Sequence, residues 1–376
     1  MGLSETRLSC QGEAVFRVAI AEDTSDFFSE CLDHVRWISA LVVLTSHARN
    51  AIFIPFIQIQ TPTAFDYVFY GITNLQNEAV ICFFVISGYL IGGKLLNYYR
   101  NSHVPVVRYI INRLVRLYIV LIPSLVLAFI VQSGGYCKPK DPTTWAGNLF
   151  FLQDILVDTV KCNEPLWSLA NEFWYYAIGL LVVVFLVKSR SIAAVGLVAC
   201  LSLLLLDDID SHHVLLYFSV WVGGLCLVWS GALSRLDLGM PVSVGVLLVG
   251  LAISRSHLID DLFLLRDLFI GFGVFLVLLS ARNSRAGVVV PRFARFMAAF
   301  SFSLYLTHWS ILAVLKKLLP KVNLHAADVS TLLIYLAVCF ACLSFAFVFA
   351  WLTERNTGYV RTMVTKALIG KSLSKP

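Results

Sequence analysis

Long apolar runs, separated by short polar and basic segments, dominate the chain. A helix needs about 20 apolar residues to cross a bilayer. Windows of that kind give ten candidate spans, near 33–55, 77–97, 112–132, 166–187, 191–206, 214–231, 240–254, 262–281, 299–318 and 330–352. The runs lack the two-residue alternation of an outer-membrane strand. The pattern therefore predicts an all-α, polytopic membrane helix bundle of about ten transmembrane helices.

Composition supports a membrane protein and gives it an orientation. The 376 residues are 59% hydrophobic and 14% charged, whereas a soluble domain is about 25% charged. If the N-terminus lies inside, twenty of the 29 basic residues fall on the cytoplasmic side, so both termini are predicted to be cytoplasmic. The net charge of +6 reflects these short basic loops, and no nucleic-acid partner is expected.

The pattern divides the chain into three parts. Residues 1–31 form a polar cytoplasmic segment without the apolar core of a signal peptide, residues 32–357 form the transmembrane domain, and residues 358–376 form a basic cytoplasmic tail. The outer connection 133–165 contains NLFFLQDILV, which is too short to span and predicts a re-entrant or interfacial helix. Residues 282–298 predict a basic cytoplasmic loop that could have interfacial character. Cys137 and Cys162 share the outer connection and are a candidate disulfide if that compartment is oxidising.

The first apolar run carries an arginine and a histidine on one helical stripe. Arg36 and His47 are eleven residues apart, so on a helix they share a face within roughly 20° and are separated by a rise of about 16 Å. If Arg36 lies at a membrane surface, His47 lies near the bilayer centre. An ionisable group at that depth suggests a functional site, although an arginine at a helix end and a hydrogen-bonded core histidine would give the same pattern.

Two later stretches add charged groups at helix ends. Arg113 and Arg116 are three residues apart, so they face one side at the cytoplasmic mouth of the third span. Their guanidinium groups suit phosphate, while topology alone could explain Arg113. Glu172 lies about two turns into the fourth span among aromatic residues that include Trp167. A carboxylate there needs a cationic or hydrogen-bonding partner.

Smaller signals lie in the second and ninth spans. Ser87 and Gly88 in FFVISGYLI allow two helices to approach closely, which ordinary packing also uses. Tyr305 and His308 are three residues apart in SFSLYLTHWSIL. Two histidines on different helices, together with a buried glutamate and an arginine pair, suggest a polar centre inside the bundle.

Six elements, taken in order, resemble acyltransferase family 3, the integral membrane O-acyltransferases that modify cell-surface glycans. They are LDHVRWISALVVLTSH, FFVISGYLI, NRLVRLYIVLIP, LWSLANEFWYY, SFSLYLTHWSIL and TERNTG, and they span residues 32–357. The chain resembles the stand-alone form of the family, without the appended esterase-like domain of the SGNH type. The resemblance implies the transfer of an acyl group, usually acetyl, from cytoplasmic acyl-CoA to a sugar hydroxyl.

The resemblance also implies roles for individual residues. His47 matches the family's essential histidine, Arg36 its paired arginine, and Glu172 its fourth-helix glutamate. The remaining matches are Arg113 and Arg116 for acyl-CoA binding, Ser87 and Gly88 for the SG motif, and Tyr305 and His308 for the late YLxH motif, with Trp167 as a further residue shaping the site. Acyl-CoA is then a co-substrate, with no permanently bound cofactor. The acceptor is a polysaccharide, an O-antigen or a lipid-linked sugar, and the location is the bacterial inner membrane.

These residue types suit acyl transfer. A histidine near neutral pH can act as the base that activates a hydroxyl, or can carry the acyl group itself. Glu172 could orient the acceptor or pair with His308. One alternative is a transporter with a buried His/Glu relay, although no inverted repeat is visible. A metal enzyme is a second alternative, but no HExxH pattern occurs, and only His212 and His213 are adjacent, so no metal ligands are assigned.

Overall fold

A computed structural model describes residues 26–204, 214–229, 233–255, 263–284, 291–319 and 329–370. The predicted N-terminal segment up to residue 25, the acidic loops around Asp207 and Asp260, and the pair His212 and His213 lie outside these ranges. The structure is 83% helical, and no strand occurs within the described ranges. The all-α fold class is therefore confirmed.

Every predicted span coincides with a helix. The helices are α1 (Asp26–Ile52), α2 (Ala64–Ile72), α3 (Gln76–Arg100), α4 (Val106–Ser133), α5 (Pro142–Leu149), α6 (Leu166–Val187), α7 (Arg190–Leu204), α8 (Val214–Cys226), α10 (Met240–Arg255), α11 (Phe263–Asn283), α12 (Pro291–Ala298), α13 (Ser301–Leu318), α14 (Val329–Leu352) and α15 (Thr357–Ile369). Within the described ranges, five helical segments are long and apolar enough to cross a membrane by themselves. A sixth is obtained if α12 and α13, which are bent by 48°, count as one span.

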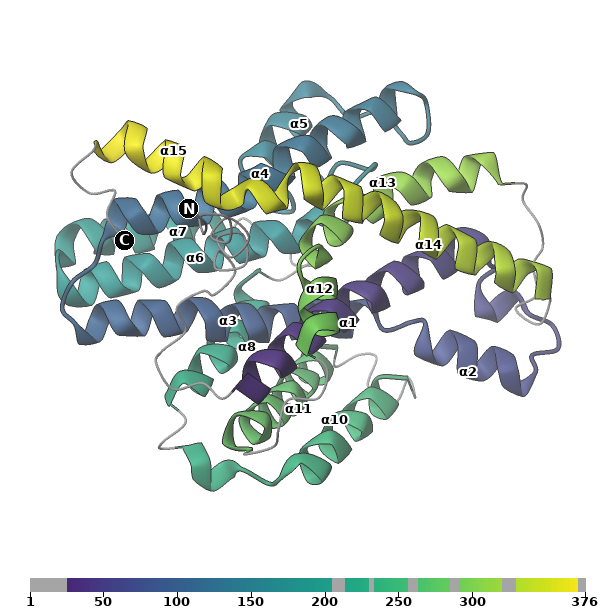
Figure 1. The fold of residues 1–376 in the computed structure, drawn as a ribbon, viewed down its shortest axis with the longest axis horizontal. Coiled ribbons are helices and arrows are strands. Elements are labelled where there is room, and N and C mark those ends of the chain that lie inside the picture. Colours follow the sequence, from purple (N-terminus) through teal and green to yellow (C-terminus); the bar gives the residue numbers. More distant parts are fainter. Residues whose placement is uncertain are drawn as a thin grey trace, which may run out of the picture.

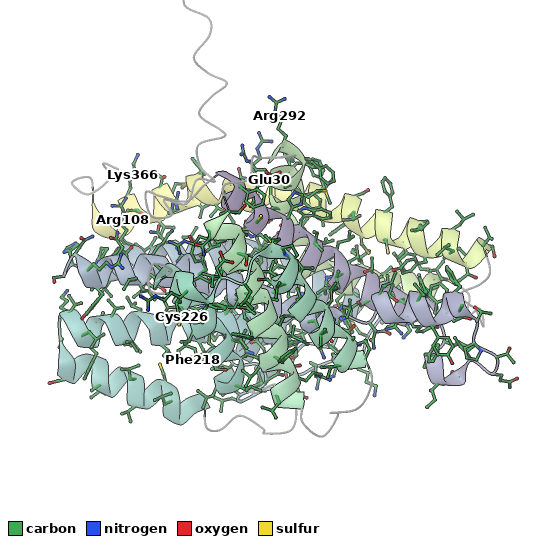
Figure 2. All side chains as sticks on the ribbon, turned by 90° about the horizontal axis from the view of Figure 1, so that it is seen from below. Glu30, Arg108, Phe218, Cys226, Arg292 and Lys366 are labelled. Carbon is green, nitrogen blue, oxygen red and sulfur yellow. A yellow bond between two sulfur atoms is a disulfide. The ribbon has the colours of Figure 1, made fainter. Side chains whose placement is uncertain are left out.

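Helix α1 packs against both α3 and α13. Figure 1 shows α14 and α15 following one another across the molecule. Helix α6 packs against α3 and also against α7. Figure 2 shows Arg108, Arg292 and Lys366 along one edge of the molecule. These three residues are among the twenty basic residues that the charge pattern assigns to the cytoplasmic side.

Glycine lets α3 and α8 come close together. A Cβ added at Gly88 would lie 1.9 Å from the backbone oxygen of Trp221, and one at Gly224 would lie 2.0 Å from the backbone oxygen of Val85. No side chain fits at such distances, so each helix uses a glycine where it meets the backbone of the other. This contact fixes the position of Ser87, which precedes Gly88.

Two local expectations were wrong. Helix α1 begins at Asp26, before the apolar window, because Asp26, Glu30 and Asp33 keep this stretch out of the window although Phe28 is fully buried. The predicted boundary at residue 31 therefore falls within the helix. The outer connection forms α5 ahead of the expected segment, with Asp141 accepting a hydrogen bond from the Thr144 N–H at 2.8 Å. Residues after Leu149 leave the helix, since Phe151 and Asp154 have φ of 59° and 61°. Within the expected cytoplasmic loop 282–298, residues 291–298 form the helix α12, and the side of the membrane on which this loop lies stays a prediction.

Candidate active site

The two histidines suggested by the sequence meet between α1 and α13. Nδ1 of His47 lies 2.9 Å from Nε2 of His308, and the two rings are nearly parallel at 10°. Nδ1 of His308 lies 2.9 Å from the backbone oxygen of Leu304, one helical turn earlier. His308 is buried, at 1% exposure. The pairing joins residues 261 positions apart.

The partners of His308 fix where the protons lie when both rings are neutral. A carbonyl oxygen only accepts, so Nδ1 of His308 carries the proton and donates it to Leu304. Nε2 of His308 is then an acceptor, and Nδ1 of His47 must be the donor in their shared hydrogen bond. This leaves the other nitrogen of His47, Nε2, without a proton. It is a free lone pair of the kind a general base needs.

His47 lines a cavity of about 420 Å³. The cavity is bounded by α1, by the first turns of α3 and α6, by α13 and by residues 154–165 of the outer connection. Tyr305, Trp167 and Trp309 also line it, and the edge-on Trp309 ring has its centroid 4.8 Å from that of His47. The volume is typical of a small-molecule site.

His47 lies near the end of α1 that meets the outer connection. It is five residues from the end of the helix at Ile52, a rise of about 7–8 Å. It lies beside the first turns of α3 and α6 and close to the outer connection, and its position near the bilayer centre stays a prediction. Helix α1 is continuous from Asp26 to Ile52, so the expected rise of about 16 Å between Arg36 and His47 holds.

Residues 160–165 are held against α13 by several backbone contacts. Asn163 donates through its amide to the backbone oxygen of Leu306, Ser310 donates to that of Cys162, and the Trp309 indole donates to that of Lys161, at 2.7–3.0 Å. The structure also joins Cys162 to Cys137 in a disulfide. The wall of the cavity is thereby fixed relative to the histidine pair.

A second polar cluster lies on the part of the bundle where α4 begins. The Arg113 guanidinium carbon lies 5.6 Å from the ring centroids of both Tyr109 and Tyr176, in cation–π geometry. Arg116 forms an ion pair with buried Glu354, at 3.8 Å. Glu354 also accepts hydrogen bonds from the backbone N–H and hydroxyl of Ser303 on α13.

Glu172 belongs to this second cluster. Its carboxylate accepts hydrogen bonds from the Tyr176 hydroxyl and, at 3.1 Å, from the Ser87 hydroxyl. Ser87 in turn accepts from the Trp221 indole at 3.3 Å. Glu172 neither pairs with His308 nor appears among the described residues that line the cavity. The expected pairing with His308 is therefore wrong: α6 turns Glu172 towards α3, where Ser87 lies beside the close helix contact. That Glu172 orients the acceptor stays a prediction.

Arg36 connects the first helix to the second cluster. It pairs with Asp33 on the preceding turn at 3.3 Å. It also lies within electrostatic range of Arg116, Glu354 and Glu172. Arg36, Arg113 and Arg116 thus gather around one region, and His47 is set apart from it along α1.

Helix α13 is the element common to both clusters. Ser303 binds Glu354, Tyr305 hydrogen-bonds Ser168 at 2.7 Å and the backbone oxygen of Pro165 at 3.2 Å, and His308 binds His47. Sequence reasoning assigned no role to Trp309, to Glu354 or to the charged residues of the outer connection. The stretches THWS and TERNTG contain the first two, but nothing in a single sequence says which partner each meets.

Comparison with known proteins gives one result. The sequence model of an acyltransferase domain, that of acyltransferase family 3, matches residues 29–351. The matched segment runs from α1 to the end of α14 and includes every residue of the two clusters except Glu354. Searches of curated proteins and of solved structures found no match to this chain.

Proposed function

The chain belongs to acyltransferase family 3, and on that basis we propose that it moves an acetyl group from cytoplasmic acetyl-CoA to a sugar hydroxyl. The acceptor is a polysaccharide, an O-antigen or a lipid-linked sugar at the bacterial inner membrane. That the chain is a membrane acyltransferase follows from the family match and the apolar helices. The donor, the acceptor and the histidine chemistry are the proposal.

One observation carries the chemical part of the proposal. Nε2 of His47 is the unprotonated nitrogen of a histidine that lines a cavity, and the hydrogen bond to His308 holds its ring. A positioned histidine typically contributes about 10²–10⁴-fold to a proton-transfer step. The same nitrogen could instead attack the thioester, so Nε2 of His47 is the reacting atom whether His47 acts as the base or carries the acyl group.

The reaction balances with His47 as the base. The sugar hydroxyl oxygen attacks the thioester carbonyl carbon while its proton moves to Nε2 of His47. The carbon–sulfur bond breaks as the new carbon–oxygen ester bond forms. The imidazolium then returns the proton to the CoA thiolate, which leaves as the thiol. If His47 carries the acetyl group instead, the bond between Nε2 and the carbonyl carbon forms as the carbon–sulfur bond breaks and CoA thiolate leaves. In a second step the sugar hydroxyl oxygen attacks that carbon, the carbon–nitrogen bond breaks, and the hydroxyl proton ends on the thiolate.

The arginine cluster supports the donor half of the proposal. Arg36, Arg113 and Arg116 supply three guanidinium groups, the side chain best suited to phosphate oxygens. Asp33 pairs with Arg36 and Glu354 with Arg116. CoA carries its phosphates at one end and its thioester at the other, joined by an extended pantetheine arm. The rise of about 16 Å from Arg36 to His47 is the separation that this arm would cross. Ser87, Gly88 and Glu172 then position the helices around it.

The experiment separates an acyltransferase from a transporter. The full-length protein, reconstituted in lipid vesicles, is given acetyl-CoA labelled in its acetyl group together with a methyl glycoside. We expect labelled acetylated sugar and an equal amount of free CoA thiol, neither of which forms in protein-free vesicles. Sugar uptake that proceeds without acetyl-CoA, with no labelled ester, would contradict the proposal and favour the transporter. Label retained by the acid-quenched wild-type protein, and absent from the His47→Ala variant, would identify His47 as an acyl carrier.

A further inference from the structure

The cavity next to His47 has a composition that selects among sugars. Three carboxylates line it, from Asp154, Asp158 and Glu164, against the single ammonium group of Lys161. All four belong to the outer connection. The other polar side chains in the lining are the uncharged Gln76, Asn77, Thr159 and Tyr305, together with His47. Lys140 also bonds Asp158, so these three carboxylates and two ammonium groups leave one negative charge in excess.

These carboxylates are held in place by neighbouring groups. The Thr159 hydroxyl donates to Asp154 at 2.8 Å, Lys161 bonds Glu164 at 3.0 Å, and Lys140 bonds Asp158. The hydrogen bond from Lys140 lowers the pKa of Asp158 below its ordinary value, so this carboxylate stays ionised at neutral pH. Oxygens of this kind accept hydrogen bonds from sugar hydroxyls and repel acidic groups.

Two indole rings supply the apolar part of the same cavity. Trp167 packs against Phe84 and Tyr217, with centroids 6.3 and 5.9 Å away. Trp309 is fixed by its hydrogen bond to the Lys161 backbone and lies edge-on to His47. Rigid aromatic rings offer a flat surface for the carbon-bound hydrogens of a sugar ring. A ring stacked on Trp309 would place its hydroxyls beside His47.

We propose that this cavity is the acceptor subsite and that it takes a sugar without an acidic group, stacked on Trp309 and Trp167. Asp154, Asp158 and Glu164 bind its hydroxyls and disfavour uronic acids and other anionic sugars. The inference rests on the proposed function, because the sugar is defined as the species that receives the acetyl group. It adds the class of acceptor and the residues of the outer connection that select it.

The test compares two probes that differ in one charge. Methyl glucuronoside and its methyl ester share the ring and the remaining hydroxyls, but only the free acid is an anion. Acetyl transfer from labelled acetyl-CoA to each probe is measured with the reconstituted full-length protein at low ionic strength, where charge effects are largest. We expect kcat/KM to be at least about tenfold higher for the ester, a difference of about 1.4 kcal/mol.

Three variants connect this preference to the cavity. Glu164→Gln should narrow the ratio between the probes, and the fold should tolerate it because the Lys161–Glu164 pair is solvent-exposed and such pairs contribute under about 1 kcal/mol. Trp309→Ala should raise the KM for the ester about tenfold while leaving the KM for acetyl-CoA unchanged. Trp351→Ala is the matched control, since Trp351 is 56% exposed on α14 and should not alter either KM.

The outcomes separate the two proposals. Transfer that proceeds equally well with the acid and the ester, or an unaltered acceptor KM in Trp309→Ala, overturns the acceptor inference and leaves the acyltransferase proposal standing. A complete absence of acetyl transfer to both probes overturns both proposals.

Discussion

The His308→Leu variant tests whether the histidine pair works as a unit. Leucine removes the acceptor for the Nδ1–H group of His47, which lies 2.9 Å from Nε2 of His308. A buried donor without a partner costs about 1–3 kcal/mol. If that cost falls on the transition state, the rate falls by about 5- to 150-fold. The ring of His47 would also be free to turn, or to hold its proton on Nε2 instead.

His308→Gln is the matched variant, because its side-chain oxygen can accept from His47 and its amide can donate to the Leu304 carbonyl. The assay is the initial rate of CoA thiol release and ester formation in lipid nanodiscs, with both substrates varied. We expect His308→Leu to lose kcat with an unchanged KM for acetyl-CoA, and His308→Gln to recover most of the loss. A wild-type kcat in His308→Leu would refute the reasoning, as would equal losses in the two variants, which would point to packing alone.

Three further predictions concern packing, the outer connection and metals. Gly88→Ala should lower the free energy of unfolding by about 1–3 kcal/mol, because its Cβ would meet the Trp221 backbone. Gly93→Ala should be tolerated, since its Cβ would lie 3.6 Å from Val228. Thermal unfolding of both variants checks this difference. Replacing Cys137 and Cys162 with serine should destabilise the protein by about 3–4 kcal/mol, given their separation of 25 residues. Cys200→Ser is the control and should leave stability unchanged. Equal thermal unfolding of the double variant and Cys200→Ser would argue against a structural disulfide. Activity should survive a strong chelator, because no group of three or more His, Cys, Asp or Glu side chains in the described residues could hold a metal ion.

The helices could be predicted well because apolarity and length leave little choice in a bilayer. The windows 166–187 and 330–352 match α6 and α14 within one residue. The start of α1 was missed because Asp26, Glu30 and Asp33 interrupt the apolar residues of its first turns. The helix expected after Asn148 was wrong because Phe151 and Asp154 adopt left-handed backbone conformations, which hydropathy does not report.

The site could be predicted only as a set of residues. Periodicity placed Arg36 and His47 on one stripe and marked His308 as unusual, yet it could not pair residues 261 positions apart. That pairing depends on how α1 and α13 pack, which is a property of the whole bundle. Glu172 shows the reverse case: its residue type was informative, but its rotation on α6 was not available from the sequence. The carboxylates of the outer connection were invisible for the same reason, since the backbone around them follows no repeating pattern.

Removing the imidazole of His47 tests the central claim most directly. Acetyl transfer from labelled acetyl-CoA is measured in His47→Ala and in His34→Ala, which alters a half-buried histidine on the same helix that hydrogen-bonds Trp37 away from the cavity. Comparable folding of both variants is checked by thermal unfolding. The proposed mechanism predicts a loss of at least about 100-fold in kcat for His47→Ala and near wild-type transfer for His34→Ala. Transfer at the wild-type rate in a folded His47→Ala protein would contradict it.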